Sequence, residues 1–275
     1  MKDVQNLQDN RDVDIQKVGI KNLYLPLTVQ RKNSSDQIVS AVARVNVSLP
    51  KHYKGAHMSR FVEVLNEWQN KHLLGVDIKG CLEKIIKKLN AKSGELKFTF
   101  TYFIDKKSPV KKMSAPMGYK CSFEGRITDG DYKFILGVSV PVTTLCPCSK
   151  EISEYGAHNQ RAIINVKISY DESEQIWLED LIKMIESCSS SPVYTLLKRE
   201  DEKFVTEKAW ENPKFVEDVL RDVVVKLRNI KNINEFEVDC EAMESIHNHS
   251  AWAYQHEIRC DVKSKKSVSV LSHKK

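Results

Sequence analysis

The stretch from Val39 to Val47, VSAVARVNV, places an apolar residue at every second position. Because successive side chains of a strand point to opposite faces, this alternation predicts a β-strand with one buried face. The largely apolar run from Leu23 to Val29 comes shortly before it and predicts a second strand. The chain is therefore expected to begin with two neighbouring strands.

The same reading extends along the rest of the chain. Apolar residues recur at helical spacing over 58–68 and 78–89, and strict alternation returns over 96–102, with another strand expected at 119–127. Further strands are predicted over 134–140 and 164–170, helices over 178–185 and 215–227, and strands over 236–240 and 252–258. Asn212-Pro213 is a typical helix start. The stretch 187–211 between the last two helices is predicted to be an irregular, functional loop.

This order of elements predicts an antiparallel α+β architecture of two ββααββ units, each with paired helices. The boundary is expected near Asp129-Gly130-Asp131. Residues 20–128 would form the first unit, and 129–263 the second, which carries most of the site motifs. Residues 1–19 would be an N-terminal extension and 264–275 a basic tail.

Composition narrows the class of protein. Of 275 residues, 41% are hydrophobic and 29% charged, which is typical of a globular protein. The first residues lack the apolar core of a signal peptide, and no run is long enough to span a membrane, so no membrane partner is expected. Seven cysteines, an odd number, argue against a disulfide framework. We therefore expect a cytoplasmic protein with free thiols.

The net charge of +6 is concentrated in two places. Nine lysines lie within 106–112 and 263–275, and without them the rest of the chain is slightly acidic. The body of the protein is therefore not expected to bind nucleic acid.

The segment CPCSKEISEYGAHNQR, residues 146–161, gathers two thiols and an imidazole. In an extended chain, Cys146 and Cys148 would point to one face. Thiolate and imidazole are ligands that zinc prefers, so we expect half of a metal-activated catalytic site here. The alternative is that these are ordinary packed or surface side chains.

A second group of candidate ligands is the His-x-His of ESIHNH, residues 244–249, between the last two strands. A third is the charged stretch around Glu202. Cysteine, histidine and glutamate together can make a catalytic zinc site with one open position, in which bound water becomes a nucleophile near neutral pH.

Three strings, PVTTLCPCSKEISEYGAHNQR, YTLLKREDEKFVTE and ESIHNHSAWAY, together resemble the metal-dependent GTP cyclohydrolases of type IB. The resemblance covers most of the chain, with the motifs in the family's order. It implies a bimodular tunnelling fold and a homotetramer with active sites between subunits. It also implies a hydrolase that converts GTP to 7,8-dihydroneopterin triphosphate and formate, the first step of folate-type pterin biosynthesis.

By this resemblance, the metal ligands would be Cys146, His158, Glu202 and His247. Glu200 is the rival of Glu202, and His249 the rival of His247. His249 is otherwise a candidate acid–base group, and Cys148 a candidate catalytic or supporting thiol. Glu217 matches the position of the family's guanine anchor. A carboxylate suits that role, because it can accept two hydrogen bonds from guanine. Its alternative role is to stabilise a helix start.

The triphosphate requires cations, and four stand in the motifs: Lys150, Arg161, Lys198 and Arg199. Each could instead be a solvated surface charge. Zinc, manganese and ferrous iron all suit such a mixed ligand set, and the sequence does not choose among them.

Three alternatives stay open at this point. An archaeal-type GTP cyclohydrolase would give a cyclic phosphate product. A nitrile reductase of queuosine synthesis would use a cysteine nucleophile and a nicotinamide cofactor in place of a metal. A non-catalytic zinc-binding module would bind both thiols and both histidines and unfold on chelation.

Overall fold

The protein is described from a computed structural model, which covers residues 5, 7–68, 75–171 and 174–259. The strands are β1 (Ile15–Val29), β2 (Gln37–Leu49), β3 (Gly94–Lys107), β4 (Ser114–Thr128), β5 (Asp131–Leu145), β6 (Asn159–Tyr170), β7 (Ser191–Pro192), β8 (Ile233–Met243) and β9 (Ser250–Ile258). The helices are α1 (Met58–Trp68), α2 (Gly75–Leu89), α3 (Pro147–Ile152), α4 (Leu178–Glu186), α5 (Arg199–Glu211) and α6 (Val216–Arg228). The predicted α+β class with antiparallel strands is confirmed.

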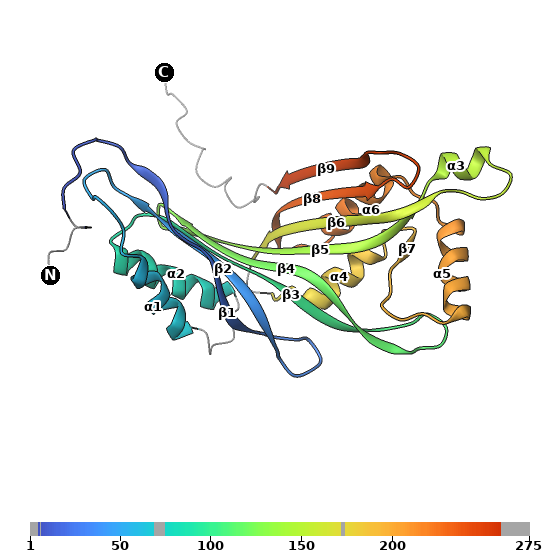
Figure 1. The fold of residues 1–275 in the computed structure, drawn as a ribbon, viewed down its shortest axis with the longest axis horizontal. Helices are drawn as coiled ribbons and strands as arrows, with labels where there is room; N and C mark the ends of the chain where they lie inside the picture. The colour runs from blue at the N-terminus through green and yellow to red at the C-terminus, as the bar shows by residue number, and fades with distance from the viewer. Residues whose placement is uncertain (1–4, 6, 69–74, 172–173, 260–275) are drawn as a thin grey trace, which may run out of the picture.

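All nine strands belong to a single sheet, in the order β1-β2-β3-β4-β5-β6-β8-β9, with the short β7 paired to β5. The predicted boundary at 129–131 is the β4–β5 hairpin, where Asp129 and Gly130 have φ of 53° and 90°. Positive φ at both central residues is typical of a two-residue hairpin turn. The two predicted halves therefore share one continuous sheet, which runs the length of the molecule (Figure 1).

The core lies on one face of this sheet. One row of paired residues crosses six strands, and all of its members are buried: Ala41, Phe100, Cys121, Val138, Val166 and Val238. The helices α1, α2, α4 and α6 pack against this face with the apolar residues that their helical spacing brings to one side. Such burial, at about 25 cal/mol per Å² of apolar surface, is the main force that holds helices and sheet together.

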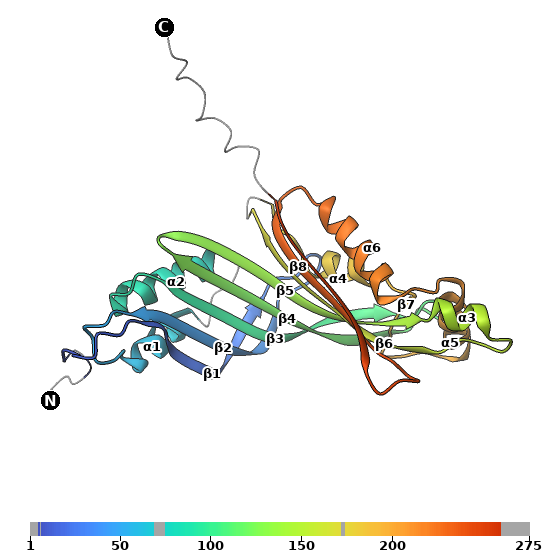
Figure 2. The ribbon, with the colours of Figure 1, turned by 90° about the horizontal axis from the view of Figure 1, so that it is seen from above.

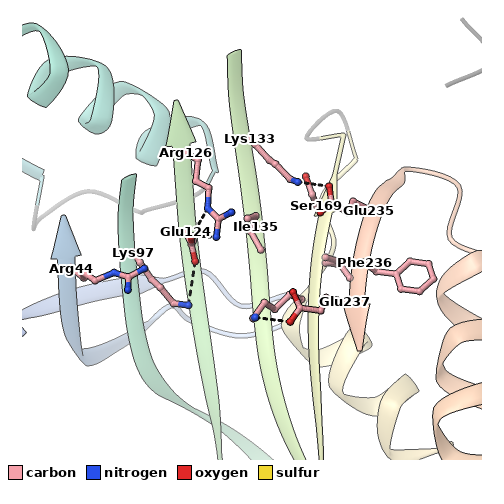
Figure 3. A pocket seen from close by; sticks show the side chains of 12 residues that line it. Arg44, Lys97, Glu124, Arg126, Lys133, Ile135, Ser169, Glu235, Phe236 and Glu237 are labelled. Carbon is pink, nitrogen blue, oxygen red and sulfur yellow. Dashed lines mark hydrogen bonds and ion pairs between the residues drawn. The ribbon is translucent and has the colours of Figure 1, made fainter. Parts of the chain in front are cut away.

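The opposite face of the sheet is charged. Figure 3 shows ion pairs within and between strands in a hollow of about 270 Å³. There the carboxylate of Glu124 lies 3.2 Å from the ammonium of Lys97 and 2.6 Å from the guanidinium of Arg126. None of the site residues predicted from the sequence lines this hollow. Cys146, His158 and His247 lie instead in the segments that join strands.

Two local predictions were wrong. The stretch 187–211 is not irregular throughout, because 199–211 forms α5. Only Asp201 and Ala209 of α5 are buried, so the helix has almost no apolar stripe that a sequence pattern could reveal. Asn212 ends α5, and its N–H donates to the carbonyl of Lys208 (3.2 Å), while α6 begins at Val216.

The remaining differences concern the ends of the chain. The first strand begins at Ile15, so part of the expected extension over 1–19 belongs to the sheet. The expected basic tail, 264–275, lies outside the described residues. Among the helices that the structure describes, none has both the length and the apolar character needed to cross a membrane.

Candidate active site

The conformation around Cys146 is set by Pro147. Strand β5 ends at Leu145, and Pro147 occupies the first turn of α3, where its fixed φ is compatible with a helix. Cys146 is the N-cap of α3, and its Sγ accepts a long hydrogen bond from the N–H of Ser149 (3.4 Å). The segment is therefore not extended, and the expectation that both thiols share a face of an extended chain was wrong. Cys146 is half-buried and Cys148 is exposed.

His158 is held next to Cys146 by backbone and side-chain bonds. The N–H of Cys146 donates to the carbonyl of His158 (3.1 Å), and the N–H of His158 donates to Oγ of Ser149 (3.2 Å). These bonds close residues 146–158 into a compact loop that leaves the end of β5 and returns into β6. The structure thus brings together the first two predicted metal ligands.

The imidazole of His158 is oriented by residues that the sequence analysis did not assign. Its Nδ1 donates to Oε1 of Gln160 (2.9 Å) and lies 3.7 Å from Oε2 of Glu244. Gln160 in turn donates from Nε2 to Oγ1 of Thr144 (3.1 Å) and to Oε1 of Glu244 (3.3 Å). With Nδ1 engaged, the lone pair for a metal ion is on Nε2, which is how ligating histidines are commonly held. In the sequence, the role of Gln160 is indicated only by its position, which alternates with the buried residues of β6.

The His-x-His loop starts at this network. Glu244 follows β8 directly, and the loop 244–249 leads into β9. His247 and His249 are both exposed, and their rings stack on each other with centroids 5.0 Å apart. The loop is therefore anchored beside His158 at its first residue, while its two imidazoles project into solvent.

Glu202 lies elsewhere. It is exposed on the first turn of α5, where the neighbouring Glu200 pairs with Lys111 (2.9 Å). The C-terminal end of α5 lies near Cys146. Just beyond that end, the N–H of Lys214 donates to the carbonyl of Leu145 (3.0 Å), the residue before Cys146. The nine residue-to-residue steps of helix from Glu202 to Glu211 span about 13 Å. Both views place α3 and α5 at the same end of the sheet (Figures 1 and 2).

The predicted substrate-binding residues are spread over this end of the molecule. Lys150 is engaged within the chain: its ammonium donates to the carbonyl of Trp210 (2.5 Å) and lies 4.8 Å from the centroid of the Trp210 ring. Arg161 is exposed on β6, and Lys198 and Arg199 are exposed at the start of α5. Glu217 is exposed on the first turn of α6, near β8. No hydrogen bond links these groups to each other in the described part of the chain.

The accessible thiols are few. Cys81, Cys121, Cys188 and Cys240 are buried in the core. Burial raises the pKa of the Cys188 thiol, and it raises that of Cys240 to about 12. Because a thiolate is the form that binds metal, these cysteines are unsuited to the site. Among the described cysteines, Cys146 and Cys148 remain as accessible candidates.

Within the described residues of one chain, no three histidine, cysteine or acidic side chains gather as a metal site would require. The donor types nevertheless fit a divalent ion, because a thiol and an imidazole stand on neighbouring residues, Cys146 and His158, that a backbone hydrogen bond joins. The structure thus contains half of the predicted ligand set in one place, with the His-x-His loop next to it.

Comparison with known proteins agrees with the motif strings. The family model described as "Type I GTP cyclohydrolase folE2" matches residues 1–253. A GTP cyclohydrolase FolE2 of Geobacter sp. (strain M21) is 51% identical over 255 residues, covering 92% of this chain and 93% of the relative. One of Thermosipho africanus (strain TCF52B) is 49% identical over 253 residues, covering 92% and 96%.

Solved structures of uricases share the fold. The uricase of Arthrobacter globiformis superposes with a TM-score of 0.54 at 6% identity, covering 94% of this chain and 96% of that one. The uricase of Bacillus fastidious gives a TM-score of 0.54 at 11% identity, covering 96% and 99%. At such identities the likeness concerns the fold alone. From the family model and the relatives that are half identical, we conclude that the chain belongs to the type I GTP cyclohydrolase FolE2 family, enzymes that make dihydroneopterin triphosphate for folate biosynthesis.

Proposed function

We propose that this enzyme releases formate from GTP by attack of water on guanine C8, at a divalent metal site of Cys146, His158, Glu202 and His247. The observation that carries this proposal is the Cys146–His158 pair. One backbone hydrogen bond of 3.1 Å links the two residues, and the Nδ1 of His158 is already occupied by Gln160. This bond and this contact support the assignment of both residues as ligands.

The donor set suits zinc, manganese or ferrous iron. When bound, such an ion lowers the pKa of water toward about 7 and so supplies a nucleophile at neutral pH. The protein's part is to fix the imidazole through Gln160 and Glu244 and to keep the thiol of Cys146 accessible. His247 would join by a rearrangement of the loop 244–249, whose first residue already lies against His158.

Glu202 would join from another copy of the chain. Within one chain, about 13 Å of α5 separates it from the end of β5. We therefore propose a homotetramer with active sites between subunits, built on the bimodular tunnelling fold of two ββααββ units. The likeness to uricases, which have the tunnelling fold, supports this architecture.

The other predicted residues take supporting roles in this proposal. Glu217 would accept hydrogen bonds from the guanine ring, and it is exposed and free to do so. His249, stacked on His247, would deliver protons during ring opening, because an imidazole titrates near neutral pH. Cys148 would act beside the site from the first turn of α3. The basic groups Lys150, Arg161, Lys198 and Arg199 would contact the triphosphate, and Lys150 would first have to leave Trp210.

Free thiols and mixed ligands suit a reducing, cytoplasmic setting, which we propose for this enzyme. The family match disfavours the reductase and the zinc-binding module. A cyclic phosphate product would instead point to the archaeal-type reaction.

The experiment is to load the protein separately with zinc, manganese or ferrous iron and to measure formate release from GTP. The organic product is weighed by mass spectrometry. We expect formate and dihydroneopterin triphosphate with at least one metal and neither after chelation. Turnover that survives complete metal removal would overturn the metal site, although the family assignment would stand.

A further inference from the structure

A second candidate site lies away from these motifs. A cavity of about 720 Å³ opens between the end of β3, the β3–β4 loop, α4 and α5. We call it the lysine cavity, because five lysines line it: Lys106, Lys107, Lys112, Lys183 and Lys208. Three carboxylates also line it: Asp105, Glu179 and Glu186. None of the residues assigned above to metal or GTP binding belongs to its lining.

The deepest lysine is already neutralised. The ammonium of Lys106 donates to the carboxylate of Glu186 (2.5 Å) and to the carbonyl of Val193 (2.7 Å). Glu186 is buried and also accepts a hydrogen bond from the hydroxyl of Tyr119 (2.7 Å). Burial, opposed by Glu186, lowers the pKa of Lys106, and the charge of Lys208 lowers it further. Lys208 is thus near enough to repel Lys106. The negative charge of Glu186 is already balanced by Lys106, so it does not neutralise Lys208.

The other four lysines of the cavity lack a counter-ion among the described residues, and one of them, Lys112, donates to the carbonyl of Pro109 (2.7 Å). Lys107, Lys183 and Lys208 form no ion pair with any residue that the structure describes. Of the other two carboxylates, Glu179 accepts from the hydroxyl of Tyr102 (2.7 Å) and the N–H of Lys32 (3.2 Å). Asp105 is exposed and is the single remaining carboxylate of the lining. The rim therefore carries more positive than negative charge, which favours an anion of several charges.

One wall of the cavity is aromatic. Tyr194 is half-buried, and Lys106 lies 4.4 Å from the centroid of its ring. Phe204, on α5, is 42% exposed although it is a large apolar side chain. An exposed aromatic face beside unpaired ammonium groups is suited to a flat ring that carries phosphate.

The cavity is built in advance of any ligand. The β3–β4 loop is held to α5 by Asp201, which is fully buried and accepts from the N–H groups of Val110 (2.7 Å) and Lys111 (2.9 Å). The ends of this loop are also joined, because the N–H of Ser108 donates to the carbonyl of Met113 (2.9 Å). These contacts hold Lys107, Lys183 of α4 and Lys208 of α5 around the same cavity.

The lysine cavity also lies on a different side of α5 from Glu202. Phe204 and Lys208 are four residues apart, so they share one face of the helix. Glu202 is two residues before Phe204, which places it about 200° around the axis. Glu202 and the cavity therefore point in nearly opposite directions.

We propose that the lysine cavity is a second binding site, distinct from the catalytic centre, for a small phosphorylated compound with a flat aromatic ring. The phosphates lie among Lys107, Lys183 and Lys208, and the ring lies against Tyr194 and Phe204. A bound ligand would contact α5, which carries Glu202 on its other face.

The first test uses inorganic triphosphate with the metal-loaded wild-type enzyme. Lysines are methylated with and without the anion, and each site is quantified by mass spectrometry. We expect protection of Lys107, Lys183 and Lys208, but none of Lys87 on α2 or Lys203 on α5, which lie outside the cavity. Equal protection of all five lysines would mean general screening and would overturn the proposal.

The second test compares two double variants by calorimetry. Lys107→Ala with Lys208→Ala should weaken the binding of triphosphate at this site about tenfold or more, since it removes two charged contacts. Lys87→Ala with Lys203→Ala removes the same charge elsewhere and should leave binding unchanged. Phe204→Ala should weaken the binding of adenosine triphosphate but not that of inorganic triphosphate.

Formate release from GTP separates this site from the catalytic one. The cavity variant should keep its turnover at saturating GTP and its KM for GTP. If the KM rose in step with the loss of triphosphate binding, the cavity would be part of the GTP site, and the proposal of a second site would be wrong.

Discussion

Cys146 and His158, twelve residues apart in the chain, are joined by a hydrogen bond of 3.1 Å from the N–H of the first to the carbonyl of the second. The bond ties the end of β5 to the start of β6. Cys146 is half-buried, and the side chain of His158 is 12% exposed, with its Nδ1 against Gln160. In our proposal, the loop holds two ligands close together before metal binds, which lowers the entropic cost of binding.

Cys146→Ala should abolish both bound metal and turnover while leaving a folded oligomer. The Sγ of Cys146 makes only one long hydrogen bond, to Ser149, so its loss should cost little stability. Metal content, size-exclusion chromatography and formate release measure the three properties. The matched variant Cys148→Ala removes the neighbouring thiol and should retain the metal. Full metal content in Cys146→Ala would contradict the ligand assignment.

Gln160→Leu should lower metal affinity by about tenfold to a hundredfold, as is usual when the partner of a ligating histidine is removed. Without Gln160, the Nδ1 of His158 loses its 2.9 Å contact and the ring can turn. Competition with a chelator measures the affinity. Gln255→Leu, on β9, removes a glutamine whose partner is Glu257 and serves as the control. Equal affinities in the two variants would mean that Gln160 does not orient the ligand.

Glu217→Gln should keep the metal but raise the KM for GTP about tenfold to a hundredfold, because a charged hydrogen-bond acceptor is lost. Asp218→Asn is the matched control, since it removes one negative charge from the same helical turn. Asp218 accepts from the N–H of Phe215 (3.1 Å), so its variant should lose stability and keep its KM. The same KM in both variants would favour a helix-end role for Glu217.

The sheet was predictable because its strands alternate and one face is buried. The rows from β2 to β8 match the alternation seen in the sequence, for example at Ala41 and Val138. Helix α5 was missed because a surface helix with few buried residues leaves no periodic pattern. Helix α3 was missed because a single turn is set by Pro147 and its cap rather than by burial.

The site was predictable only in part. Cys146 and His158 share one loop, so their closeness depends on local geometry. Gln160 and Glu244 are in contact because β6 pairs with β8, and no local sequence pattern predicts a contact between residues so far apart in the chain. The assignment of Glu202 rests on resemblance, and the described chain leaves it at the far end of α5. In our proposal, Glu202 comes from another copy of the chain, and that contact cannot be seen in one chain.

Asp201→Asn should destabilise the protein, and the effect should depend on pH. Burial alone would raise the pKa of Asp201, but hydrogen bonds from the N–H groups of Lys111, Val110 and Lys198 outweigh it and lower the pKa to about 2. The unfolded chain has an ordinary value near 3.9. The carboxylate therefore stabilises the fold fully above about pH 4, and this stabilisation is lost as the pH falls towards 2.

The measurement is the free energy of unfolding in urea, at fixed protein concentration, from pH 7 down to pH 2. The difference between wild type and Asp201→Asn should be constant from pH 7 to about pH 4.5 and should then shrink. Asp180→Asn is the control, because Asp180 is exposed and its pair with Lys32 should contribute little. A difference that did not change with pH would mean that Asp201 acts through shape rather than charge. The loop that it holds would then not need the carboxylate to keep the lysine cavity in place.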